Sequence, residues 1–127
     1  MKNPTAYREL EATAELIIEE TLAELPAEVA VHARQVPVLL RPEAEEDYDT
    51  GIPREELMGL FSGLPHAEGP SSDPEDQPRI TLFLRTIWDE AGANREDYAE
   101  EVRLTLLHEL GHYLGWDEEE IEERGLG

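Results

Sequence analysis

The sequence predicts a small α+β domain in which a mixed sheet of about three strands is covered on one side by helices. Two stretches with helical periodicity, residues 5–24 and 94–114, enclose two strand-like stretches, residues 36–41 and 79–84. The chain has 127 residues, of which 39% are hydrophobic, and this is enough for one buried core. We therefore expect a single domain over residues 1–127.

Residues 5–24 form the first predicted helix. Glutamates occupy one face, and apolar side chains recur at helical spacing on the other, namely Tyr7, Leu10, Ala14, Ile17, Ile18 and Leu22. Pro26 disfavours helical backbone at the residue before it, so this helix should end near Leu25. Residues 27–34 are expected to add a short helical turn.

The middle of the chain alternates between strand-like and turn-rich stretches. Residues 36–41 and 79–84 are rich in β-branched and apolar residues, which favours strands. Residues 42–55 are acidic and turn-rich, and residues 64–78 are rich in Pro, Gly, Ser and Asp, so both are predicted as loops. Residues 57–63 are compatible with helix or strand, and their glycines favour a short strand or edge segment.

The C-terminal part is predicted to be helical. A segment over residues 85–91 is broken by Gly92. Asn94 is a typical N-cap, because its side chain can accept a hydrogen bond from a backbone N–H in the first turn of the next helix. That helix should continue to Leu114, and a short helix is expected at residues 118–124.

The long C-terminal helix contains the sequence His-Glu-Leu-Gly-His at residues 108–112. His108 and His112 would lie one turn apart on the same face, where two imidazoles can bind one metal ion. Zn²⁺ suits two neutral imidazoles combined with an oxygen ligand, and another divalent ion is the alternative. Glu109 would lie beside the metal, where it can act on a water molecule without being a ligand.

The residues after the second histidine supply a candidate third ligand. Gly115 should end the helix, because glycine adopts the left-handed conformation at little cost. The carboxylates of Asp117 and Glu118 follow at once, and either can return to the metal. The alternative interpretation is a surface helix with histidines at its edge. Four leucines favour a buried helix instead, in which unpartnered histidines would be costly: Leu106, Leu107, Leu110 and Leu114.

The pattern His-Glu-x-x-His-x-x-Gly-x-x-acid resembles the zincin superfamily, especially the small bacterial zincin-like metallopeptidases whose motif ends in Asp. It is also similar to the metzincins, which usually place His at the last position and have a Met-containing turn further along; residues 119–127 contain no Met. The matching position here is Glu118, whereas the residue type matches Asp117. The resemblance implies a minimal zincin-like fold with His108, His112 and Glu118 as metal ligands and Asp117 as the alternative third ligand.

This resemblance also implies an activity. We expect a zinc-dependent metallopeptidase in which Glu109 is the general base and in which a peptide adds to an edge strand of the sheet at residues 57–63. Tyr113 is a candidate additional donor, although its position favours packing. The alternative is a metal-binding regulatory or interaction module without proteolytic activity, favoured by the lack of a C-terminal subdomain. A vestigial site, with two carboxylates competing for one position, is the third hypothesis.

Composition limits the other functional classes. The chain has no cysteine, which excludes disulfides and thiolate metal sites. Its formal net charge of −21 argues against binding to nucleic acid or to anionic membranes. It permits a basic peptide or protein substrate, although a solvated, highly soluble surface is the simpler interpretation of the charge. We find neither an apolar run long enough to span a bilayer nor the layout of a signal peptide, so the expected location is the cytoplasm.

Overall fold

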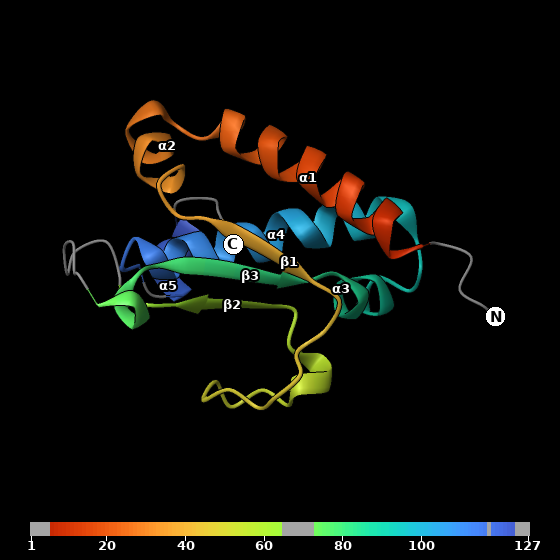
Figure 1. Ribbon diagram of the computed structural model, residues 1–127. Helices are drawn as coiled ribbons and strands as arrows, with labels where there is room; N and C mark the ends of the chain where they lie inside the picture. Colours follow the sequence, from red (N-terminus) through yellow and green to blue (C-terminus); the bar gives the residue numbers. More distant parts are fainter. Residues whose placement is uncertain (1–5, 65–72, 117, 124–127) are drawn as a thin grey trace.

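The computed structural model describes residues 6–64, 73–116 and 118–123 (Figure 1). Within these residues, the α-helices are α1 (Tyr7–Glu24), α2 (Ala27–Ala33), α3 (Leu84–Glu90), α4 (Arg95–Tyr113) and α5 (Glu118–Glu123). The strands are β1 (Val38–Arg41), β2 (Gly59–Ser62) and β3 (Arg79–Phe83), and the short 3-10 helices are η1 (Arg54–Glu56) and η3 (Pro74–Asp76). The elements follow one another as the sequence predicts, with helices at both ends and strands between them.

The three strands form one mixed sheet in the order β1-β3-β2. β1 runs parallel to β3, with Val38 opposite Ile80. β2 runs antiparallel to β3, with Gly59 opposite Leu82. The segment over residues 57–63, which by sequence is compatible with helix or strand, therefore contains an edge strand of the described sheet, as expected from its glycines.

The helices cover one face of this sheet. Alternation along β3 turns Ile80 and Leu82 toward α1 and α4, and both side chains are fully buried. The same core includes Leu10, Ala14, Leu22, Leu84, Ile87, Trp88, Val102, Leu106 and Leu110. The loop between β1 and β2 leaves the sheet on the other side (Figure 1). There Phe83 packs with Ala44 and Leu57 in a small second cluster.

A buried hydrogen bond fixes α4 against α1. The Tyr98 hydroxyl donates to the Leu10 carbonyl over 2.9 Å, and the ring of Tyr98 makes an edge contact with Trp88 at 5.5 Å between centroids. Burial raises the pKa of Tyr98 well above its usual range, because the ionised phenolate would lose its hydration. α4 is thus held by polar and apolar contacts along the half that precedes the histidines.

Most predicted boundaries agree with the structure within two residues. The helix expected from Asn94 to Leu114 is α4, and the one expected over residues 85–91 begins one residue earlier as α3. The sequence predicts only a loop for the acidic stretch, residues 42–55, yet Ala44 in it is buried and η1 begins at its end. Among the described helices, none is long and apolar enough to cross a membrane.

Candidate active site

The helix that carries the histidines has well-defined ends. The Asn94 side chain accepts a hydrogen bond from the Asp97 backbone N–H at 3.0 Å, which confirms the predicted cap. At the other end Gly115 has φ +81°. The Gly115 N–H donates to the His112 carbonyl at 3.0 Å, and the Trp116 N–H donates to the Gly111 carbonyl at 2.9 Å. The left-handed glycine and the return bond from Trp116 are typical of a Schellman-type helix end, and they stop the helix at the predicted glycine.

The structure brings His108 and His112 together on one face of α4. Their Nε2 atoms lie 3.1 Å apart, and their ring planes are nearly perpendicular, at 84°. Two bonds of about 2.0–2.1 Å to one zinc ion, meeting at a tetrahedral angle, place the nitrogens about 3.3–3.4 Å apart. The observed separation, at which the two rings are also within hydrogen-bond distance of each other, is close to this span, so the distance between the nitrogens is compatible with a shared ion.

Glu109 lies beside the histidines and is only 9% exposed. It packs against β2 at a point where that strand comes unusually close to α4. A Cβ atom placed on Gly59 would lie 3.3 Å from Glu109 Cγ and 2.5 Å from Thr105 Cγ2. A larger residue would force Thr105 or the strand to shift, and the small size of glycine allows the strand to shield the Glu109 side chain.

The two residues predicted from the sequence as candidate third ligands, Asp117 and Glu118, follow the end of α4. Asp117 lies outside the described residues. Glu118 is the first residue of α5, although its side chain is not among those described. In the part of the chain that the structure describes, no three His, Asp or Glu side chains form a metal-binding group. The described site therefore consists of the two histidines and the neighbouring Glu109.

A cavity of about 510 Å³ opens in front of these residues, between β2 and α4. Both histidines and Glu109 line it on the helix side, and Gly59 and Phe61 line it on the strand side. A second cavity of about 300 Å³ also borders His108, Glu109 and Gly59 and extends toward the N-terminal half of α4. Because the two cavities share these walls, they form one groove along β2, which we call the β2–α4 groove.

The backbone of β2 offers hydrogen-bonding groups to this groove. The Phe83 N–H donates to the Met58 carbonyl at 2.9 Å, which makes Met58 and Phe83 a hydrogen-bonded pair. In an antiparallel ladder such pairs alternate with pairs whose N–H and C=O groups point away from the partner strand. The register then directs the peptide groups of Gly59 and Phe61 toward the outer edge of the sheet.

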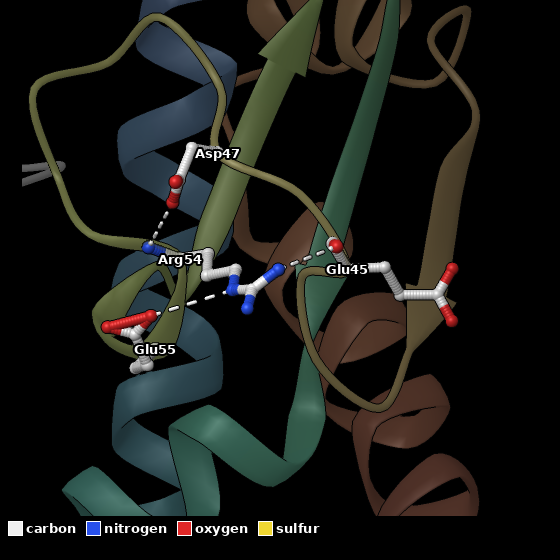
Figure 2. Close-up of polar contacts among 4 residues, drawn as sticks. All are labelled: Glu45, Asp47, Arg54 and Glu55. Carbon is white, nitrogen blue, oxygen red and sulfur yellow. Dashed lines mark hydrogen bonds and ion pairs between the residues drawn. The ribbon is translucent and has the colours of Figure 1, made fainter.

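The loop between β1 and β2 forms one rim of the groove, which the sequence did not predict. Figure 2 shows how Arg54 holds this loop. The Arg54 backbone N–H donates to Asp47 Oδ1 at 3.2 Å, Nη1 donates to the Glu45 carbonyl at 3.1 Å, and Nε lies 3.6 Å from Glu55 Oε2. The loop so held carries Ile52, which lines both cavities. The apolar residues inside this acidic stretch are the sequence feature from which a packed loop could have been predicted.

Tyr113, the candidate additional donor, packs against the edge strand, as its position in the sequence favours, and it is not among the residues that line either cavity. It is 3% exposed, and its ring lies 5.9 Å from that of Phe61. Burial raises the pKa of Tyr113. The Tyr113–Phe61 contact instead joins the C-terminal end of α4 to the edge strand, and so helps to keep the groove walls in register.

Comparison with known proteins agrees with this geometry. No curated protein matches the sequence. The sequence model of one family, described as zincin-like metallopeptidase, matches residues 27–127, which include the whole described sheet and the histidine helix. The match covers far more than half of the chain. The chain therefore belongs to the zincin-like metallopeptidase family.

Proposed function

We propose that this protein hydrolyses peptide bonds with a zinc ion bound by His108 and His112 and with Glu109 as the general base. One observation carries the proposal: the two Nε2 atoms lie 3.1 Å apart in the same groove that the shielded Glu109 side chain lines. A helix with histidines at its edge would have no need of this groove or of a carboxylate buried beside them. Membership of a metallopeptidase family supports the same assignment.

For the third ligand we propose Glu118, with Asp117 as the alternative. Glu118 is the tenth residue after His108, the position indicated by the motif, and it follows the chain reversal at Gly115. Its side chain is also longer by one methylene group and so tolerates a less exact backbone position. Three protein ligands would leave a fourth position open, which is the arrangement of catalytic rather than structural zinc sites.

Glu109 would move the protons of the reaction. Bound zinc supplies a Lewis acid that polarises the scissile carbonyl and makes a water molecule more acidic. The Glu109 carboxylate would accept the proton of the attacking water and then deliver it to the leaving amine. Its near-complete burial between Thr105 and Gly59 keeps competing solvent away from the carboxylate and limits its rotamers.

The β2 edge would hold the substrate in an extended conformation. The outward N–H and C=O groups of Gly59 and Phe61 can pair with a peptide backbone, as in other cases of strand addition. Such pairing does not depend on the substrate side chains, and it would align the scissile bond along the groove in front of Glu109. An unfolded polypeptide is therefore the substrate form that this edge favours.

The variant Glu109→Gln tests the proposal, because it keeps the side-chain shape and removes the base. Zinc content, measured by elemental analysis, should equal that of the wild type, whereas kcat on an unfolded polypeptide should fall by about 10²–10⁴-fold. Glu96→Gln changes an exposed carboxylate in the first turn of the same helix and serves as the control. His108→Ala should lose both zinc and activity.

Two results would count against the proposal. If Glu109→Gln cleaves as fast as the wild type, another group is the base. If zinc-loaded wild type binds the metal but cleaves no unfolded polypeptide, the protein is better described as a metal-binding regulatory or interaction module.

A further inference from the structure

The β2–α4 groove continues beyond Glu109 into the cavity of about 300 Å³. Its walls are apolar close to the site, where Leu57 and Met58 face Leu104. Two carboxylates line it as well, Glu56 from η1 and Glu101 from α4. Both elements border the cavity, so a side chain entering it would pass apolar walls and encounter the negative charge of two carboxylates.

The nearby arginines do not neutralise these two carboxylates. Arg54 is the first residue of η1, but its guanidinium donates a hydrogen bond to the Glu45 carbonyl and forms an ion pair with Glu55 (Figure 2). Arg103 lies on α4, but it pairs with Glu100, at 4.0 Å. Among the residues that the structure describes, neither Glu56 nor Glu101 takes part in an ion pair.

The dimensions suit a long side chain. Glu101 precedes Glu109 by eight residues, and both line the groove. Eight residues correspond to about 12 Å along an α-helix. A peptide residue bound in front of Glu109 would need an extended side chain, and the Glu101 side chain would have to span the rest of this distance. Arginine and lysine have the matching form, because an aliphatic stem precedes a cationic head.

We propose that this cavity is a subsite for an arginine or lysine side chain of the substrate, with Glu56 and Glu101 as specificity-determining residues. The inference rests on the proposed peptidase function, and it narrows the substrate class to peptides with a basic residue at one fixed position relative to the scissile bond. The net charge of −21 would add a long-range attraction for such peptides, but only the cavity can select one position.

Mapping of cleavage sites tests the proposal. Zinc-loaded protein is incubated with a peptide library that is degenerate at every position, and the products are sequenced by mass spectrometry. Arginine and lysine should be enriched at one position and not at the others. In a matched pair of peptides, arginine there should raise kcat/KM about five- to twenty-fold over its neutral analogue citrulline, as expected for a partly exposed ion pair with two carboxylates.

Paired variants separate the subsite from the general charge of the protein. Glu56→Gln and Glu101→Gln should each reduce the arginine-to-citrulline ratio several-fold. Glu43→Gln and Glu96→Gln remove the same charge from exposed carboxylates that line neither cavity of the groove and hold no arginine in an ion pair among the described residues, and they should keep the ratio. Equal losses in all four variants would mean that long-range attraction alone is responsible, and the proposal would be wrong.

A binding measurement decides the case even without catalysis. Acetyl-arginine amide and acetyl-citrulline amide are titrated into metal-free protein and followed by backbone amide NMR shifts. Shifts at residues 56–59 and 101–109 with the arginine compound alone, reduced in Glu101→Gln, support the subsite whether or not peptides are cleaved. The subsite is refuted if peptides are cleaved without enrichment of basic residues, or if the two compounds give equal shifts. Neither result bears on the peptidase function, which the Glu109→Gln variant tests separately.

Discussion

The closest contact between the edge strand and the site helix gives the sharpest prediction. Gly59 has no positive φ, so alanine can adopt its backbone conformation, and the cost of Gly59→Ala is steric. The new methyl group would lie 2.5 Å from Thr105 Cγ2, well inside van der Waals contact. Thr105 is 8% exposed and its side chain is β-branched on a helix, so it has little freedom to move aside.

The expected magnitude follows from two opposing terms. Forcing an extra methyl group into a packed contact costs about 1–3 kcal/mol. Replacing glycine with alanine at a compatible backbone position stabilises the folded protein by about 0.4–1 kcal/mol, because the unfolded chain loses conformational entropy. A contact of 2.5 Å with a side chain that has little freedom to move belongs in the upper half of the first range. We therefore expect Gly59→Ala to lower the free energy of unfolding by about 1–2.6 kcal/mol. Catalysis should also fall, because a shift of β2 would displace Glu109.

A double-mutant cycle with Thr105→Ser identifies the cause. Serine lacks the Cγ2 methyl group, and that deletion alone should cost about 0.5–1.5 kcal/mol. In the double variant the alanine methyl would occupy the vacated space, so the two changes should be less costly together than their sum by about 1 kcal/mol or more. Urea unfolding followed by Trp fluorescence measures all four proteins.

Gly51→Ala provides the control. Gly51 has φ +79°, and no other atom lies within 4 Å of the place where a Cβ would stand. Its substitution should therefore cost free energy through backbone strain and should not respond to Thr105→Ser. If Gly59→Ala proves neutral, or if its effect and that of Thr105→Ser add within about 0.5 kcal/mol, the close packing of β2 on α4 is not as described.

Two further predictions concern the core and the metal. Tyr98→Phe removes the bond to the Leu10 carbonyl and should cost about 1–3 kcal/mol. Since burial raises the pKa of Tyr98, its folded form keeps the proton above about pH 10 while the unfolded form loses it. Wild-type stability should therefore fall as pH rises there, and that of the variant should fall less, in urea unfolding at two pH values. Zinc titration calorimetry should show a large loss of affinity in Glu118→Ala and little in Asp117→Ala; the opposite order would make Asp117 the third ligand.

The histidine helix could be predicted from sequence because its signals are local. The Asn94 cap, the leucine pattern and the Gly115 stop each act within one or two turns, and the structure shows the cap and the stop as hydrogen bonds. The strands around Leu39 and Ile80 were likewise recognisable from their apolar runs. The order β1-β3-β2 was not, because strand order depends on contacts between residues far apart in the chain.

The groove could not be predicted from the sequence, because one of its rims is the loop between β1 and β2. Its many carboxylates indicate a solvated loop, and most of them are indeed exposed. What gives the loop a defined place is a few apolar residues and one arginine: Ala44 and Leu57 pack against Phe83, and Arg54 closes the loop on itself. The contacts with Phe83 join residues that are far apart in the sequence, and the Arg54 bonds, which span seven and nine residues, follow no repeating pattern from which they could be predicted.

Gly59 lies where the edge strand contacts the side chains of the candidate site. From sequence alone, a glycine at this position weakens a strand, and for that reason it favours an edge segment. In the structure, the missing side chain is what lets β2 approach Thr105 and Glu109. The same approach narrows the groove, shields the Glu109 side chain and places the outward peptide group of Gly59 beside it. A residue that is unfavourable for the strand is therefore the one that brings the outer edge of β2 close to the Glu109 side chain, as the proposed peptidase function requires.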